Sequence, residues 1–212
     1  MTVPDYTLYL VTDAPARYPR DLLAGVEDAV AGGASIVQYR ATSGTRRELY
    51  DSARALAALL RPRGVPLIIN DHVDLALAVS ADGVHVGQND LPPAVVRRLL
   101  GPERLIGLSL TAPGQLDTLD PTGIDYLGIG PVFATASKTD AAAALGLDAL
   151  ARMVARSPLP VVAIGGISIQ RAPAVFATGV AGIAVVAALS AALDPTAAAL
   201  ALRAAAAHRP AP

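Results

Sequence analysis

Short runs of β-branched residues alternate with longer amphipathic segments along the chain, and this alternation restricts the fold more than any other feature. The short runs end in Gly, Asp or Asn, whereas the longer segments are rich in Ala, Leu and Arg. Such a pattern is typical of parallel strands joined by crossover helices. Eight strands are expected, at 7–12, 35–39, 66–70, 83–86, 105–110, 126–130, 160–164 and 182–186, with helices between them.

The repeats favour a closed (β/α)8 TIM barrel over an open doubly wound sheet. The strands at 160–164 and 182–186 are apolar on both faces, as expected between covering helices and a filled barrel interior. An open sheet would normally carry a glycine-rich turn after its first strand, where this chain reads Thr12, Asp13, Ala14, Pro15. The length of 212 residues fits a single barrel domain spanning residues 1–212.

Composition excludes several classes of function. A formal net charge of -1 provides no general attraction for nucleic acid or an anionic membrane, and the absence of cysteine excludes disulfides and thiolate chemistry. The sequence shows neither an export signal nor a long apolar run, so we expect a cytoplasmic protein. The Ala-rich stretch 197–207 predicts a last helix rather than a frayed tail. Both a monomer and a homodimer remain open.

Polar residues gather where the predicted strands end, which is where β/α barrels form their active sites. They are Gln38, Arg40, Asn70, Asp71, Gln88, Asn89, Asp90 and Ser109.

Gln38 and Arg40 are two residues apart on one strand, so both are expected to face the barrel mouth. The Arg40 guanidinium is suited to binding a phosphate group. The alternative is an internal salt bridge from Arg40 to Asp71 or Asp90.

Asp71 and Asp90 follow neighbouring strands, where two carboxylates repel each other unless a cation lies between them. Mg²⁺ is the natural candidate, because it takes oxygen ligands from one or two carboxylates together with substrate phosphates. The alternative is that each Asp caps the helix that follows it, one beginning at His72 and the other after Pro92.

The stretch 133–146 (FATASKTDAAAALG) is longer than a usual β/α connection. Its Thr135, Ser137 and Lys138 are suited to binding phosphate oxygens, although an inert surface loop could have the same composition. Gly165 and Gly166, before a helix predicted to open at Ser168, would add backbone N–H groups. Two phosphate sites are therefore expected, one here and one near Arg40.

The three histidines, His72, His85 and His208, do not have the spacing of a metal triad, and no G-x-S-x-G nucleophile elbow is present. We interpret His85, inside the fourth strand, as a hydrogen-bonded core or interface residue. A covalent mechanism has no support.

Five motifs together resemble the thiamine phosphate synthase family, from YLVTD at Tyr9 to Leu189. They are GGASIVQYR (32–40), INDHVDLALAVSADGVHVGQNDLP (69–92), IGLSL (106–110), DYLGIGPVFATASK (125–138) and AIGGI (163–167).

The resemblance implies a role for each site residue. Gln38 would contact an aminopyrimidine, and Asp71 and Asp90 would hold Mg²⁺. The pyrophosphate of the pyrimidine substrate would be held by Arg40, Asn70, Ser109 and Lys138, of which Arg40, Ser109 and Lys138 would assist its departure. A thiazole phosphate would be bound by Thr135, Ser137 and Gly166.

The implied reaction is loss of pyrophosphate from the pyrimidine methylene, followed by attack of the thiazole nitrogen. The chain departs from the family pattern at Thr42, where Lys is usual, and at Ala187, where Ser is frequent. Three alternatives remain open: a thiazole tautomerase-like relative, a noncatalytic phosphate-binding barrel, and a phosphosugar isomerase or epimerase.

Overall fold

The computed structural model describes residues 4–41, 43–135 and 142–210, and in it the strands form a closed parallel barrel in the order β1 to β8. The strands are β1 (Leu8–Val11), β2 (Ile36–Tyr39), β3 (Leu67–Asn70), β4 (Gly83–Val86), β5 (Leu105–Leu110), β6 (Tyr126–Ile129), β7 (Val161–Ile164) and β8 (Gly182–Val185). Pairing of β1 with β8, with Tyr9 opposite Ala184, closes the ring. The predicted TIM barrel is confirmed, and each strand lies within two residues of its predicted bounds.

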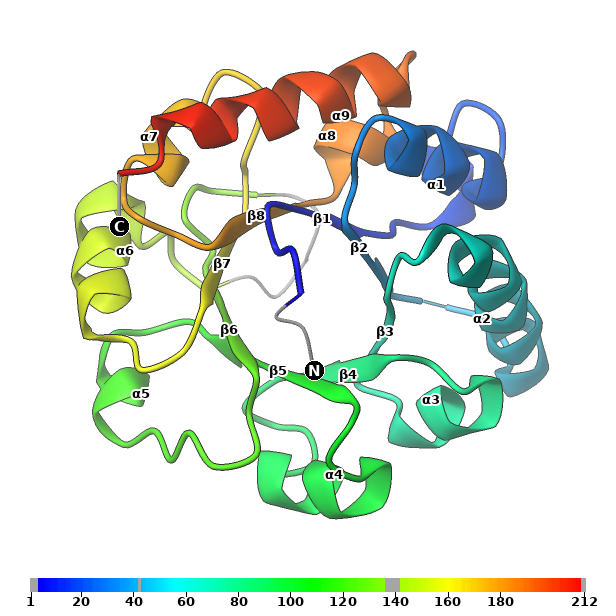
Figure 1. The fold of residues 1–212 in the computed structure, drawn as a ribbon, viewed down its shortest axis with the longest axis horizontal. Coiled ribbons are helices and arrows are strands. Elements are labelled where there is room, and N and C mark those ends of the chain that lie inside the picture. Colours follow the sequence, from blue (N-terminus) through cyan, green and yellow to red (C-terminus); the bar gives the residue numbers. More distant parts are fainter. Residues whose placement is uncertain (1–3, 42, 136–141, 211–212) are drawn as a thin grey trace.

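Helices surround the barrel, as Figure 1 shows. They are α1 (Leu22–Ala31), α2 (Arg46–Leu60), α3 (Val73–Val79), α4 (Pro93–Leu100), α5 (Gly114–Asp117), α6 (Gly146–Arg156), α7 (Ala172–Phe176), α8 (Ala187–Ser190) and α9 (Pro195–Ala204). Short 3₁₀ turns lie at Pro15–Arg17, Arg61–Arg63 and Ala205–His208. The predicted last helix is therefore confirmed, as α9 and the 3₁₀ turn that follows it.

Local sequence signals explain where the longer helices begin. Asp21 and Asp194 accept hydrogen bonds from the backbone N–H groups of Ala24 and Ala197, which caps α1 and α9. At the start of α2, Thr45 and Glu48 form a reciprocal capping box. These caps satisfy backbone donors that a helix leaves unpaired in its first turn.

The prediction of a helix opening at Ser168 is wrong. Residues 168–171 form a turn, in which Arg171 donates its backbone N–H to the carbonyl of Ser168, and α7 begins only at Ala172. The physical reason is Pro173, which has no N–H for the carbonyl four residues earlier and is tolerated only in the first turn of a helix. The backbone after β7 therefore belongs to a loop.

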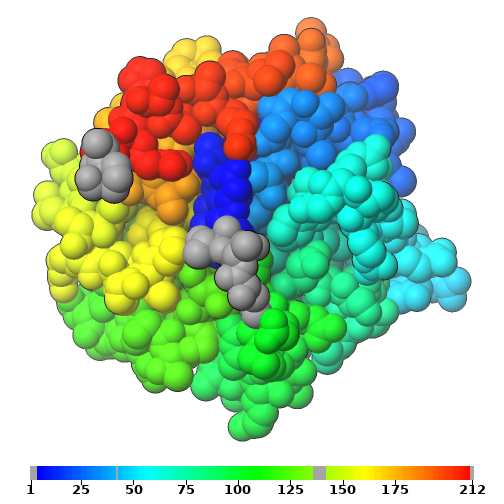
Figure 2. Space-filling view, in the orientation of Figure 1, coloured from blue at the N-terminus to red at the C-terminus, as the bar shows by residue number. Residues whose placement is uncertain are grey.

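The core has two parts, one between the barrel and its helices and one inside the barrel. The inner part includes Tyr6, Tyr9, Ile68 and Tyr126. Tyr6 lies in the segment before β1, and its ring centroid is 5.1 Å from that of Tyr126. Figures 1 and 2 show this blue segment over the centre of the face where β1 begins, so the open mouth of the barrel is at the opposite end.

Within the part of the chain that the structure describes, no helix is long and apolar enough to cross a membrane.

Candidate active site

A cavity of about 820 Å³ occupies the carboxyl end of the barrel. Its volume lies within the usual range of small-molecule sites, roughly 300–1,000 Å³. Eleven of the residues singled out from the sequence line it: Gln38, Arg40, Asn70, Asp71, Gln88, Asn89, Asp90, Ser109, Thr135, Gly165 and Gly166. The predicted Ser137 and Lys138 lie outside the described residues, as does Thr42.

One side of the cavity, which we call the strand wall, consists of Gln38, Asn70, His85 and Ser109 on β2, β3, β4 and β5. Gln38 is 5% exposed, and its Nε2 donates to the Tyr9 hydroxyl at 2.9 Å. The strand register places Asn70 directly opposite His85 on the neighbouring strand. The strand wall therefore presents side-chain groups in fixed positions.

Arg40 directly follows β2 and lines the same cavity. The Thr12 hydroxyl binds its backbone on both sides, accepting from the Arg40 N–H at 3.0 Å and donating to the Arg40 carbonyl at 3.4 Å. Thr12 is fully buried, so it anchors the backbone of Arg40 at the rim. The Arg40 side chain extends from this anchored backbone, and its guanidinium is suited to binding a phosphate oxygen.

The two carboxylates proposed as metal ligands line the cavity together. Asp71 has a left-handed backbone, with φ 61°, and its N–H donates to the His85 carbonyl at 2.9 Å. Oδ2 of Asp90 accepts from the Gly87 N–H at 2.7 Å, which engages one of the two carboxylate oxygens. No group of three or more His, Asp or Glu side chains around a common point occurs in the described ranges.

The alternative that Asp71 and Asp90 act as helix caps is wrong. The cap positions of α3 and α4 are His72 and Pro92, and neither makes a side-chain capping bond. Asp90 instead closes the loop after β4 through Gly87. Both carboxylates line the cavity without capping a helix.

Hydrogen bonds join the strand wall to two tyrosines in the barrel interior. The Tyr9 and Tyr126 hydroxyls are 2.7 Å apart, Nδ1 of His85 is 3.0 Å from the Tyr126 hydroxyl, and Nε2 of His85 is 2.8 Å from Oγ of Ser109. The interpretation of His85 as a hydrogen-bonded core residue is confirmed. Burial lowers the pKa of His85 to about 4, so its ring is neutral at physiological pH.

Two glycines make room for these aromatic rings. A Cβ added to Gly107 would lie 2.2 Å from Cζ of Tyr126 and 2.4 Å from Nδ1 of His85, and one added to Gly128 would lie 2.8 Å from Cε1 of His85. Any side chain at either position would displace the rings.

The other side of the cavity, which we call the loop wall, consists of Thr135, Gly165 and Gly166 in the loops after β6 and β7. The Phe133 N–H donates to the Gly165 carbonyl at 3.0 Å, which joins the two loops. Gly165 and Gly166 have positive φ, and a Cβ on Gly166 would lie 2.7 Å from the Ala134 carbonyl oxygen. Only glycine permits this close approach of backbone to backbone.

Sequence reasoning missed the parts played by Tyr9 and Tyr126. Both lie within the motifs that carry the family resemblance, but an aromatic residue on a barrel strand is usually interpreted as a core residue. The available signal was alternation: Tyr126 and Gly128 on β6, and Gly107 and Ser109 on β5, are two residues apart and share an inward face. A large ring beside glycines on that face indicates that the ring fills the barrel interior in a specific position.

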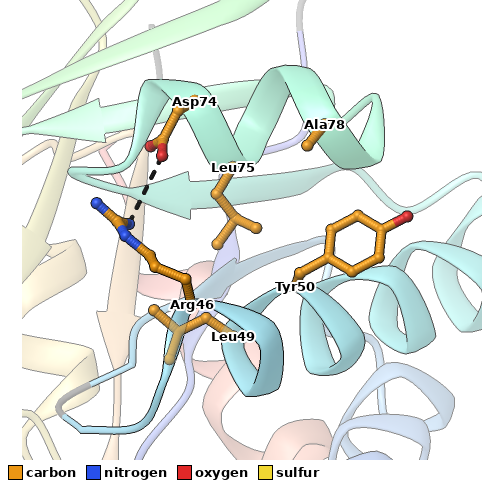
Figure 3. Close-up of a pocket in the computed structure, with 6 residues that line it drawn as sticks. All are labelled: Arg46, Leu49, Tyr50, Asp74, Leu75 and Ala78. Atoms are coloured by element: carbon orange, nitrogen blue, oxygen red, sulfur yellow. Dashed lines mark ion pairs between the residues drawn. The ribbon is translucent and has the colours of Figure 1, made fainter.

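A second, smaller hollow of about 210 Å³ lies between α2 and α3 (Figure 3). Its charged pair, Arg46 and Asp74, is 3.7 Å apart and largely exposed, an arrangement that contributes little free energy. The rest of its lining is Leu49, Tyr50, Leu75 and Ala78. We therefore assign no chemistry to this hollow.

Comparison with known proteins agrees with the geometry. Residues 8–189 match the family described as "Thiamine monophosphate synthase". The chain is 54% identical over 194 residues to a thiamine-phosphate synthase of Laribacter hongkongensis, covering 91% of this chain and 92% of the relative. It is 49% identical over 199 residues to one of Azorhizobium caulinodans, covering 94% of each.

Solved structures give the same answer for the fold. A thiamine phosphate pyrophosphorylase of Pyrococcus furiosus superimposes with a TM-score of 0.86 at 35% identity, covering 98% of each chain. A 3-hexulose-6-phosphate synthase of Salmonella typhimurium, at 16% identity and a TM-score of 0.69 over 95% of this chain and 98% of its own, shares the fold alone. Because the family match spans the whole barrel and the relatives are about half identical, the chain belongs to the thiamine monophosphate synthase family.

Proposed function

We propose that this chain is a thiamine-phosphate synthase. It joins 4-amino-2-methyl-5-hydroxymethylpyrimidine pyrophosphate to 4-methyl-5-(2-phosphooxyethyl)thiazole, giving thiamine phosphate and pyrophosphate. The observation that supports the proposal is a single cavity with two different walls. Arg40 and two carboxylates lie beside the strand wall, and the opposite side is the glycine-rich loop wall after β6 and β7. Such a cavity suits two different phosphorylated substrates at once.

Mg²⁺ fits the residues present. Asp71 and Asp90, in the loops after the neighbouring strands β3 and β4, would supply oxygen ligands, and two carboxylates with substrate phosphates and waters are the usual environment of this ion. When bound, Mg²⁺ would neutralise charge on the departing pyrophosphate.

The protein's own residues favour departure of pyrophosphate. In the reaction, the bond between the pyrimidine methylene carbon and the pyrophosphate oxygen breaks, and its electron pair stays on that oxygen. Arg40, Asn70 and Ser109 would donate hydrogen bonds to the leaving group from the cavity wall. Lys138, outside the described residues, remains a predicted second cation.

The second substrate needs alignment rather than activation. The thiazole nitrogen lone pair forms the new bond to the methylene carbon, so no proton is transferred and no protein nucleophile is needed. Thr135 and the backbone at Gly166 would hold the thiazole phosphate, together with the predicted Ser137. Gln38 would orient the aminopyrimidine ring on the opposite wall.

Ligand-dependent thermal unfolding tests the proposed pyrophosphate site. We expect pyrophosphate with Mg²⁺ to raise the midpoint temperature of unfolding. At a ligand concentration of 100 times Kd, the free energy of unfolding should increase by about 2.7 kcal/mol. Either component alone should change the midpoint temperature little. Equal stabilisation by pyrophosphate with and without Mg²⁺ would contradict the metal assignment and favour a noncatalytic phosphate-binding barrel.

A further inference from the structure

Five side chains form one continuous series of hydrogen bonds that begins and ends at the cavity. The order is Gln38, Tyr9, Tyr126, His85, Ser109, and the successive contacts measure 2.9, 2.7, 3.0 and 2.8 Å. Gln38 and Ser109 are the two ends, on β2 and β5. The positions of the hydrogens along the series therefore decide whether Gln38 and Ser109 present a hydrogen-bond donor or an acceptor to the cavity.

The number of protons limits that arrangement. Each tyrosine hydroxyl has one hydrogen, and the neutral His85 ring has one. Because Nε2 of Gln38 donates to the Tyr9 hydroxyl, the hydrogen of Tyr9 is left for Tyr126. Tyr126 then donates to Nδ1 of His85, and Nε2–H of His85 donates to Ser109.

The opposite direction beyond Tyr9 is unfavourable. If Tyr126 donated to Tyr9, the Tyr9 hydroxyl would accept twice and its own hydrogen would lack a partner among the described residues. Tyr9 is 1% exposed, and leaving a buried donor unpaired costs the free energy of its lost hydration. Among the described residues every buried polar side-chain atom has a hydrogen-bond partner, so an unpaired Tyr9 hydrogen would be an exception in this chain.

We propose that this series of hydrogen bonds has one fixed direction, which turns the Gln38 amide oxygen and the Ser109 hydroxyl hydrogen toward the cavity. Tyr9, Tyr126 and His85 are positioning residues that act through these two ends. The cavity thereby presents an acceptor on β2 and a donor on β5.

The consequence for substrates rests on the proposed function. An acceptor at Gln38 matches an amino group on the pyrimidine ring, and a donor at Ser109 matches a pyrophosphate oxygen. A pyrimidine with an oxo group in place of the amino group would set two acceptors against each other at Gln38. Fixing the direction thus selects for aminopyrimidine pyrophosphates.

The tautomer of His85 tests the direction without any substrate. With only three histidines in the chain, ¹⁵N-histidine labelling gives few ring signals, and His85→Asn identifies those of His85. We expect the Nε2–H tautomer at neutral pH in the unmodified protein. In Tyr126→Phe the donor to Nδ1 is lost, so both tautomers should be populated.

Tyr6→Phe is the matched control, because Tyr6 lies against the same Tyr126 ring while its hydroxyl joins none of the five side chains. It should leave the His85 tautomer unchanged. An Nδ1–H tautomer in the unmodified protein, or no change in Tyr126→Phe, would overturn the proposal whether or not the protein is a synthase.

Substrate discrimination tests the consequence. We expect kcat/KM for the aminopyrimidine pyrophosphate to exceed that for its oxo analogue by about 100-fold or more. Tyr126→Phe should reduce that ratio by about tenfold, and Tyr6→Phe should preserve it. A ratio that falls equally in both variants would show only a packing role for the rings. Absence of turnover with a correct His85 tautomer would instead count against the proposed function.

Discussion

The two walls of the cavity are built by opposite means. The strand wall holds side chains that are fixed by hydrogen bonds to other side chains, as Ser109 is by His85 and Gln38 by Tyr9. The loop wall exposes mostly backbone, with Gly165 and Gly166 at φ values that favour glycine. The strand wall can thus specify chemical groups on a substrate, whereas the loop wall provides shape and N–H donors.

The difference implies that substitutions on the two sides fail in different ways. Changes beside or beneath the strand wall should alter charge, tautomer or reactivity. Changes in the loop wall should alter backbone strain and binding of the thiazole phosphate.

The largest effect is expected from Asp71→Asn, beside the strand wall. Asparagine tolerates the left-handed backbone at this position, so the variant removes charge with little strain. Turnover should fall on the order of 10³-fold, because metal binding supplies several kcal/mol of charge stabilisation. Steady-state kinetics with titrated Mg²⁺ measures the loss.

Binding of the thiazole phosphate, measured by calorimetry, should change less than about twofold in Asp71→Asn, since the loop wall is untouched. Asp74→Asn, in the exposed pair with Arg46, is the matched control and should behave like the unmodified protein. Equal loss of turnover and thiazole phosphate binding in Asp71→Asn would contradict the assignment of different functions to the two walls.

Burial of neutral His85 in the strand wall predicts a pH-dependent stability. The folded pKa is lowered from 6.5 to about 4, so protons bind the unfolded chain first as pH falls. The contribution of neutral His85 to the free energy of unfolding is fully present above pH 6.5. It is lost progressively as the pH falls to about 4, by about 3 kcal/mol in total. Urea unfolding across this range measures it.

His85→Asn is the comparison for that measurement. It should be less stable at neutral pH but should lose less free energy of unfolding on acidification, because the buried imidazole is absent. Parallel pH profiles for the two proteins would show that His85 does not carry the effect.

Gly166→Ala tests the loop wall, with Gly64→Ala as a matched control. The φ values are 64° and 65°, but a Cβ at Gly64 meets nothing within 4 Å, whereas one at Gly166 lies 2.7 Å from the Ala134 carbonyl oxygen. Both should lose about 1 kcal/mol for the left-handed backbone, and Gly166→Ala about 1–2 kcal/mol more. Only Gly166→Ala should weaken binding of the thiazole phosphate, by about tenfold. The same losses in both variants would argue against close loop contact.

The smallest effect is expected from Arg171→Met behind the loop wall. Arg171 donates to the Gly166 carbonyl at 2.8 Å, and its guanidinium carbon lies 4.6 Å from the Phe133 ring centroid. Loss of this exposed contact, worth about 0.5–1 kcal/mol, should raise KM for the thiazole phosphate by about threefold.

Arg209→Met removes the same pair of contacts elsewhere, a bond to the Ala181 carbonyl at 2.8 Å and a ring contact with Phe176 at 5.2 Å. Neither Arg209 nor Phe176 lines the cavity, so KM should not change. A similar increase in KM for both variants would assign the effect to general stability.

The sequence predicted the barrel and most of the polar side chains that line the cavity, because both depend on local patterns. Strand ends are marked by residues such as Asn70 and Asp71, and barrel geometry brings strand ends together. The turn at Ser168 differs from the predicted helix because Pro173 has no N–H to donate to the carbonyl four residues earlier. The bonds from Tyr9 through Tyr126 to His85 join residues far apart in the chain, and no local pattern encodes such contacts.

The most direct test of the account is a single assay with the purified protein, both proposed substrates and Mg²⁺. Thiamine phosphate and pyrophosphate should form in equal amounts, and both should disappear when a chelator removes the metal. Binding of the thiazole phosphate without any product, at Mg²⁺ concentrations that saturate pyrophosphate binding, would contradict the synthase assignment.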